Sequence, residues 1–247
     1  MTATVIAMML MSAQEPAAPQ IVSKMLLHYR DAKSLVGTIT MAQRAGNRQA
    51  SIHTEIQFQL PSKLYILQIL NASYGQGRWL VTSNGKLFSY DAPRGVSTEG
   101  RLSPEGKRLV ESCQPNGTDI GVRGVYQASV ASLGDRSTPL DILMGRTEDL
   151  QFRNFQWATV EHQGKSQIGG VTAWTIGGSY REYQKAPISG SYQLVIDEQY
   201  RLLRYTEQET IATKVNGQQI VQEVITTWDV NVTKDAKTRD DLFKVIG

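Results

Sequence analysis

The stretch Ile52–Gln59, with the sequence IHTEIQFQ, decides the fold class of this chain. Apolar or β-branched residues alternate there with polar ones, and a period of two places successive side chains on opposite faces of a β-strand. The residues on the apolar face are Ile52, Thr54, Ile56 and Phe58. We therefore expect a strand with one dry face and one solvated face, which is typical of antiparallel sheets.

Two further strand patterns follow this stretch. The segment Leu64–Leu70 contains Gln68 as its only polar side chain, so it predicts a strand that is covered on both faces. Because both faces are apolar, the pattern leaves open which of them looks inward. Farther on, residues 78–83 and 86–90 flank Asn84–Gly85, the residue pair that best supplies the positive φ angles of a tight two-residue hairpin.

The C-terminal part of the chain also alternates between apolar and polar positions. The expected strands are Trp157–His162, Val171–Tyr180, Gly190–Ile196, Tyr200–Thr213 and Gln218–Val232. In the last of them, Val224 and Trp228 share one face, whereas Glu223 and Asp229 lie on the other. The expected turns or bulges between these strands include Gly164, Gly169–Gly170, Gly177–Gly178 and Asn216–Gly217. Such short connections predict an antiparallel, meander-like sheet.

One amphipathic helix is expected before the strands, at about Ile21–Lys33. Its apolar residues recur at the spacing of one helix face, and they are Val22, Met25, Leu26 and Tyr29. The less regular middle of the chain offers a second short candidate at Pro104–Cys113.

The segment from Ser137 to Gly145 has a compact helix signature. Ser137 or Thr138 suits the N-cap, Pro139 suits the first helical position, and Gly145 suits the terminus. A helix this short is not stable alone, so its Leu and Met side chains must dock on the rest of the protein.

Composition and charge indicate a globular protein, and the N-terminal residues indicate export. The net charge of +3 is small, and no basic run with interleaved aromatic residues occurs, so nucleic-acid binding is not expected. The apolar run Val5–Met11 with small residues near Ala13 resembles the end of a secretory signal. We expect residues 1–18 to be a signal-peptide remnant or a disordered tail. Residues 19–247 are then expected to form a single domain, because no linker long enough to divide them is evident.

Candidate catalytic residues are scarce. Cys113 is the single cysteine, and His28, His53 and His162 lie far apart without carboxylates or cysteines at metal-ligand spacing. No serine elbow, zinc-binding His pair, phosphate loop or dinucleotide fingerprint occurs. Adjacent carboxylates such as Glu148–Asp149 fall at turns, where they are usually solvated. We therefore expect no enzymatic activity, no cofactor and no metal.

Several segments, in order along the chain, are similar to one known family. These segments are Thr54–Tyr65 (TEIQFQLPSKLY), Trp79–Pro93 (WLVTSNGKLFSYDAP), Pro139–Gly145 (PLDILMG), Ser191–Asp197 (SYQLVID) and Trp228–Val232 (WDVNV), with Asp241–Phe243 near the end. Together they resemble the LolA-like family of periplasmic lipoprotein carriers and lipoprotein-sorting proteins. The resemblance implies an α+β, β-dominated fold, in which a curved antiparallel sheet of about ten or eleven strands forms an unclosed half-barrel. Short helices would cap an apolar cavity inside it.

The resemblance also implies a function. The cavity would hold the acyl chains of a lipoprotein or a related lipid, and the protein would be a soluble, monomeric periplasmic carrier. Its partners would be an inner-membrane release complex and an outer-membrane acceptor. Family members commonly have a basic residue just before the strand-ending proline that helps to latch the lid, but this sequence has Leu60 there. The alternative is an envelope stress sensor or scaffold of the same fold that acts through protein–protein interaction, because fold alone does not select function.

Candidate ligand-binding residues combine the apolar strand faces with the short helix. They are Ile56, Phe58, Leu64, Ile66, Trp79, Val81, Tyr90, Leu140, Leu143, Met144, Val224 and Trp228. An alternating apolar face is more often ordinary core than a ligand cavity. The cavity interpretation of these residues therefore depends on the family resemblance.

Overall fold

The structure is a computed structural model that describes residues 15–73, 75–84, 88–91, 121–126, 137–145, 155–182, 189–215 and 218–244. Its strands are β1 (Ser34–Ala45), β2 (Arg48–Gln59), β3 (Lys63–Ala72), β4 (Gly75–Asn84), β5 (Phe88–Asp91), β6 (Phe155–Trp157), β7 (Glu161–Ile168), β8 (Val171–Glu182), β9 (Ser189–Asp197), β10 (Leu202–Val215) and β11 (Gln218–Lys234). Its helices are α1 (Ala18–Arg30), α4 (Thr138–Leu143) and the 3-10 turn η2 (Asp240–Leu242), and residues 122–126 are also helical.

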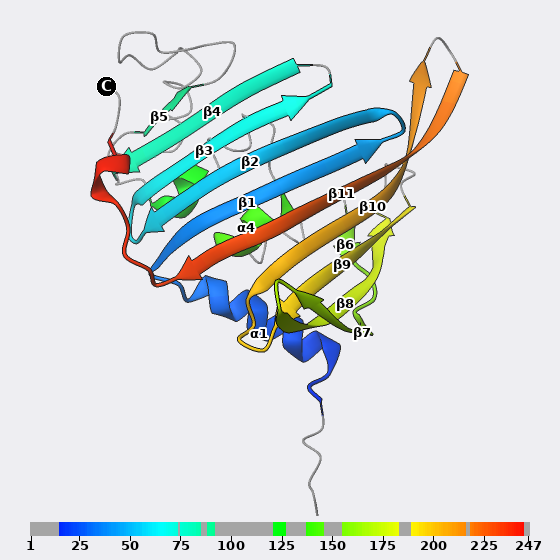
Figure 1. The fold of residues 1–247 in the computed structure, drawn as a ribbon, viewed down its shortest axis with the longest axis horizontal. Coiled ribbons are helices and arrows are strands. Elements are labelled where there is room, and N and C mark those ends of the chain that lie inside the picture. The colour runs from blue at the N-terminus through cyan, green and yellow to red at the C-terminus, as the bar shows by residue number, and fades with distance from the viewer. Residues whose placement is uncertain are drawn as a thin grey trace, which may run out of the picture.

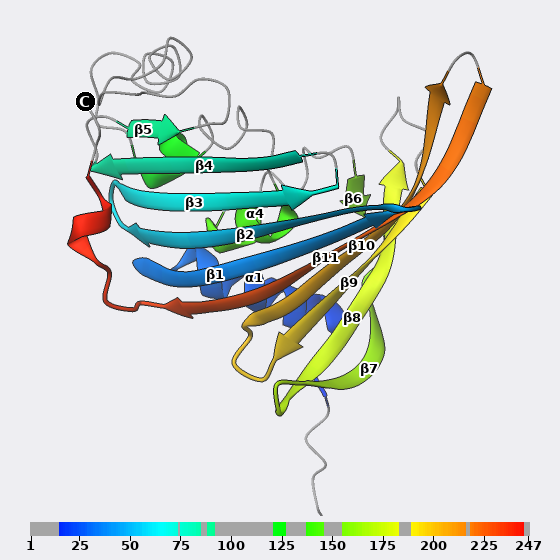
Figure 2. The same ribbon diagram turned by 45° about the horizontal axis from the view of Figure 1, so that its top comes forward.

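The described strands form one antiparallel sheet. Their order is β5-β4-β3-β2-β1-β11-β10-β9-β8-β6, and β7 pairs with β8 beside this path. Figures 1 and 2 show that the sheet is strongly curved and that its two ends do not meet. The expected β-dominated, unclosed half-barrel of ten or eleven strands is therefore confirmed.

The sheet is joined at its centre by β1 and β11. These strands pair without interruption from Leu35 opposite Lys234 to Ala45 opposite Val224. The two backbones approach closely at Gly37, where an added Cβ would lie 2.2 Å from the carbonyl oxygen of Asn231. Only glycine fits such an approach without a shift of the strands.

The pairing register between β2 and β3 determines which face of β3 lies on the concave side of the sheet. Leu64 and Ile66 pair with Phe58 and Ile56 of β2, and these four side chains are almost fully buried in one core. The opposite face of β3 is covered at only one end, because Tyr65 is buried whereas Ile69 is 46% exposed. The expectation that the whole strand is covered on both faces is thus wrong for its second half.

The C-terminal segment after β11 explains the covered end of β3. Thr238 bonds through its hydroxyl to the Gln59 side chain, and the Arg239 N–H donates to Gln57 Oε1 at 3.0 Å. Lys63 pairs with Asp240 at 2.8 Å. The segment therefore crosses the convex face at the end where β2 meets β3, and it does not reach Ile69.

Helices α1 and α4 lie against the concave face of the sheet (Figures 1 and 2). Helix α1 begins and ends three residues earlier than the sequence predicts, with Pro19 in its first turn, and its predicted face with Val22, Met25 and Tyr29 is buried. The Tyr29 hydroxyl accepts a hydrogen bond of 3.0 Å from the N–H of Leu202. The register of β10 against β9 shifts just after Leu202, so Tyr29 bonds to the sheet beside this irregularity.

Three predictions about turns and strand ends are wrong. The segment expected as one strand over Trp157–His162 is split between β6 and β7, whereas Gly164 does lie at a register shift, or β-bulge, within β7. Gly177–Gly178 lies inside β8, where an added Cβ at Gly178 would come 2.0 Å from the carbonyl oxygen of Thr159. Asn84 ends β4 and Phe88 begins β5, so Asn84–Gly85 is not the whole connection that was predicted, and residues 85–87 lie outside the described residues.

Gly169–Gly170 forms the predicted turn. Both residues have positive φ angles, of 57° and 79°, and they connect Ile168 directly to Val171 in the β7–β8 hairpin. Several predictions fall outside the described residues, namely the apolar run Val5–Met11, the short helix Pro104–Cys113 and the thiol of Cys113.

We predict that Gly37→Ala lowers the free energy of unfolding by about 1–3 kcal/mol, because the new Cβ must push β11 away from β1. Urea denaturation measures this change. The control is Ala42→Ser, which adds one heavy atom at an exposed position of the same strand and should change stability by less than about 0.5 kcal/mol. Equal stability of the two variants would contradict the close approach.

Candidate ligand-binding pocket

Most of the predicted cavity residues form the packed core beneath the helices. Their exposed fractions are Ile56 0%, Leu64 0%, Ile66 1%, Val81 0%, Leu140 1% and Leu143 0%. Leu140 and Leu143 dock α4 on the concave face, as the short helix requires. These residues therefore make the apolar wall and cover of the concave side.

The remaining predicted residues lie farther along the same face or at its margins. Val224 and Trp228 are buried on β11, at 9% and 8% exposure, and Trp79 is half-buried on β4. Tyr90 is the register partner of Val81 on β5. The structure thus places the predicted residues on one side of the sheet and spreads them along most of its length.

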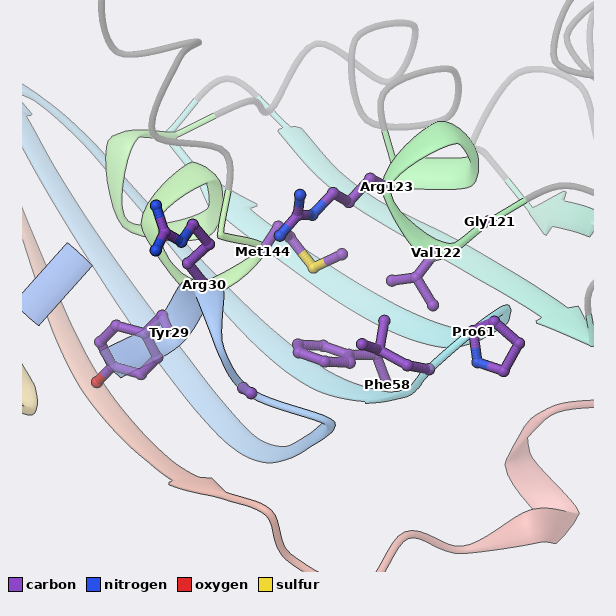
Figure 3. A pocket seen from close by; sticks show the side chains of 10 residues that line it. Tyr29, Arg30, Phe58, Pro61, Gly121, Val122, Arg123 and Met144 are labelled. Atoms are coloured by element: carbon purple, nitrogen blue, oxygen red, sulfur yellow. The ribbon is translucent and has the colours of Figure 1, made fainter. Parts of the chain in front are cut away.

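A pocket of about 330 Å³ lies where α1, α4 and residues 121–123 meet the β2–β3 turn. Phe58 and Met144 are the two predicted residues that line it. Its other lining residues are Tyr29, Arg30, Ala32, Leu60, Pro61, Gly121, Val122 and Arg123. Figure 3 shows Phe58 and Pro61 on one side of the pocket, with Met144, Arg30 and Arg123 on the opposite side. Small-molecule pockets generally enclose about 300–1,000 Å³.

Backbone hydrogen bonds fix the segments around this pocket. The N–H of Leu60 donates to the carbonyl of Lys33 at 2.8 Å, which ties the end of β2 to the chain that leaves α1. The N–H of Val122 donates to the carbonyl of Pro61 at 3.0 Å. The helical residues 122–126 are therefore held to the β2–β3 turn by the backbone, next to Leu60.

Polar contacts help to fix the orientation of helix α4, and three of them are as follows. The Ser137 hydroxyl caps the helix by accepting from the N–H of Leu140, and the Thr138 hydroxyl donates to Glu207 Oε1 of β10 at 2.9 Å. The Tyr126 hydroxyl donates to Asp141 Oδ1 at 2.8 Å, and Asp141 is fully buried. Residues 122–126 and α4 therefore bind each other as well as the sheet.

An aromatic cluster extends the concave face beyond α4. Its ring pairs are Trp157–Tyr192 at 4.9 Å, Tyr180–Tyr192 at 5.4 Å, Tyr192–Tyr205 at 6.5 Å and Tyr205–Trp228 at 5.6 Å between centroids. Burial raises the pKa of Tyr180 and of Tyr205 above its ordinary value, with the charge of Glu207 acting in the same direction. Burial also raises the pKa of Tyr29. These phenols stay neutral at physiological pH, so the interior carries hydroxyl hydrogen bonds without phenolate charge.

The predicted separation of the histidines agrees with their positions. His28 lies on α1, where burial lowers its pKa, His53 lies on β2, and His162 lies on β7 with its Nε2 2.9 Å from the carbonyl oxygen of Pro16. Within the described ranges, no three His, Cys, Asp or Glu side chains gather as a metal site would require. Among the helices that the structure describes, none has the length and apolar character of a membrane span.

Comparison with known proteins returns similar structures and no similar sequences. No family model matches the chain, and no curated protein matches it. The similar structures include LprF from Mycobacterium bovis, which is 12% identical with a TM-score of 0.41, where the match covers 89% of this chain and 96% of that one. The Mycobacterium tuberculosis lipoprotein LppX is 12% identical with a TM-score of 0.39, over 88% of this chain and 99% of that one.

A LolA superfamily protein from Nitrosomonas europaea is also among the similar structures. It is 9% identical with a TM-score of 0.27, and the match covers 93% of this chain and 98% of that one. The family expected from the sequence is thus represented among the structures that this chain resembles. At such identities and TM-scores the function has to be argued from the structure of this chain itself.

Sequence reasoning missed most of the pocket, because its lining comes from short segments far apart in the chain. Arg30 ends α1, Leu60 and Pro61 form a turn, and Gly121–Arg123 begins a helical stretch in a region whose sequence is ambiguous. Besides Phe58 and Met144, Leu60 is a sequence signal that pointed to this place, because it stands where the resemblance implies a basic residue.

We predict that Tyr126→Phe loosens α4, because it removes the hydroxyl that donates to the buried Asp141 carboxylate. The free energy of unfolding should fall by about 1 kcal/mol or more. Amide hydrogen exchange of residues 138–143 should accelerate. The control is Tyr200→Phe, which removes a hydroxyl bonded to the exposed Lys24 and should leave exchange in α4 unchanged. Unaltered exchange in Tyr126→Phe would show that this contact does not hold the helix.

Proposed function

We propose that this protein is a non-catalytic, extracytoplasmic carrier that binds the acyl chain of a lipoprotein or a related lipid. The observation that supports this function is the apolar pocket of about 330 Å³ at the open end of a helix-covered concave face. Phe58 and Met144 would contact the chain first. The buried residues of β2–β4 and α4 would form the continuing wall if the cover opens.

The energetics suit an acyl ligand. Each methylene that leaves water contributes about 0.8 kcal/mol, so a chain can be held by apolar contacts with no polar site. Met144 lines the pocket, and methionine adapts to irregular ligand shapes because its side chain is unbranched and flexible. Tyr29 and the aromatic cluster stay neutral, so no buried phenolate opposes an apolar chain.

Release of the ligand would require the cover to move. A single backbone hydrogen bond joins Val122 to Pro61, and α4 is only six residues long. A helix of that length depends on its contacts with the sheet and with residues 122–126. For the ligand to pass, these two short pieces, α4 and residues 122–126, would have to leave their contacts with the sheet and with each other.

The acylated cargo, an inner-membrane release complex and an outer-membrane acceptor are the partners that this proposal requires. The alternative is a sensor or scaffold that uses the same sheet to bind another protein. The two functions differ in whether binding requires an acyl chain, because a scaffold does not need an acyl chain in its pocket.

We predict that the full chain binds a palmitoylated peptide and not the same peptide without its acyl group. Fluorescence anisotropy of a dye on the peptide measures both affinities. Leu60→Trp should weaken binding about tenfold or more, because a bulky ring at the pocket mouth excludes part of the acyl chain. A tenfold loss of affinity corresponds to about 1.4 kcal/mol of lost contact.

Leu60 is 47% exposed, so its substitution should leave the fold intact. The matched control is Ile69→Trp, at a similarly exposed apolar position of β3 on the convex face, and it should bind as the unmodified protein does. Binding that does not depend on the acyl group would favour the scaffold alternative.

A further inference from the structure

Two arginine side chains stand at the rim of the apolar pocket. Arg30 and Arg123 line it, both are exposed, and Figure 3 shows them on the same side, beside Met144. Every other lining residue is apolar or presents backbone, apart from the phenol of Tyr29, whose hydroxyl is engaged by Leu202. The pocket therefore combines an apolar interior with a cationic mouth.

These arginines have few partners of their own. Arg30 lies 3.5 Å from Asp31, an exposed neighbour in the chain. Exposed pairs of this kind contribute little to stability. Among the residues that the structure describes, Arg123 makes no ion pair and no side-chain hydrogen bond. A guanidinium has five N–H donors that match the oxygens of carboxylate and phosphate groups.

Gly145 lies between the backbone of Arg30 and the guanidinium of Arg123. Its φ is +66°, and a Cβ added there would lie 2.8 Å from Arg30 Cα and 2.9 Å from Arg123 Nη2. The guanidinium of Arg123 thus occupies the space left by the missing side chain, next to the end of α1. A cation at the C-terminal end of a helix is favoured by the helix dipole, which gives Arg30 a structural role at the end of α1 and Arg123 a similar one beside Gly145, just after α4. A guanidinium held in this way still has N–H donors to offer an anion.

We propose that the ligand of this pocket is a single-chain amphiphile with an anionic headgroup, either a carboxylate or a phosphate monoester. Its acyl chain enters between Phe58 and Met144, and its headgroup binds Arg30 and Arg123. This inference rests on the proposed acyl-binding function and adds the chemical class of the head. Charge complementarity selects an anion, and the pocket volume of about 330 Å³ suits one chain.

The test compares ligands that differ only in charge. Palmitic acid is paired with hexadecanol, and palmitoyl lysophosphatidic acid with monopalmitoylglycerol, in competition against a fluorescent acyl probe at neutral pH. The unmodified full chain should bind each anion about tenfold more tightly than its neutral partner, because hydrogen bonds between charged groups are stronger than neutral ones. This preference should shrink as salt is added, since the headgroup site is exposed.

The double variant Arg30→Gln/Arg123→Gln should lose the preference for anions and keep its affinity for the neutral ligands. Arg48→Gln, at an exposed position in the distant β1–β2 hairpin, is the matched control and should change neither affinity. Circular dichroism verifies that each variant is folded.

Each other outcome has a distinct meaning. Equal affinity for charged and neutral partners, or equal weakening of both in the double variant, would overturn the headgroup inference and leave acyl binding in place. Absence of binding by all four ligands would overturn the proposed function together with this inference. Inorganic phosphate is the last competitor. If it displaces the fluorescent acyl probe at the same concentrations as lysophosphatidic acid does, the arginines bind a free anion, and the proposal is overturned.

Discussion

The pairing of β1 with β11 is the contact on which the rest of the structure depends. It joins the strands that follow α1 to the strands that end the chain, over eleven successive residue pairs, and thus makes one sheet from two halves. Gly37 permits the close backbone approach that this pairing needs. Without it, β1 and β11 would each be an edge strand with a row of unpaired backbone N–H and C=O groups.

The curved sheet creates a second requirement, which the helices meet. A single layer of strands has to cover its concave apolar face, and α1, α4 and residues 122–126 do so with buried apolar side chains. The cover is fixed by a few polar contacts, such as Tyr126 to Asp141 and Tyr29 to Leu202. The apolar pocket lies where these pieces meet the β2–β3 turn. The proposed function follows from this geometry, because an apolar face that is almost closed can accept an apolar chain.

Local patterns in the sequence predicted the parts of the fold that depend on neighbouring residues. The alternation over Ile52–Gln59 identified the inward face of β2, and the cap and glycine around α4 identified that helix. Properties that depend on distant segments could not be predicted in this way. The two faces of β3 became distinct only through pairing with β2 and through the C-terminal segment that covers Tyr65 and leaves Ile69 exposed.

The pocket illustrates the same limit. Phe58 and Met144 were predicted, since each belongs to a patterned strand or helix, whereas Leu60 was noted only as a departure from the family pattern. Arg30 and Arg123 come from the ends of two helical segments, and no local pattern says that Gly145 lies between the Arg30 backbone and the Arg123 guanidinium. Sequence reasoning therefore identified the apolar character of the site, and the structure was needed for its position and its charged rim.

The most direct test of the central claim is a crystal structure of the protein with a fatty acid that is brominated near the methyl end of its chain. The account predicts an anomalous bromine peak inside the apolar pocket or the adjoining concave core, on the side of Phe58 and Met144. A peak on the convex face of the sheet, or a crystal of the complex with no peak on the concave side, would contradict it.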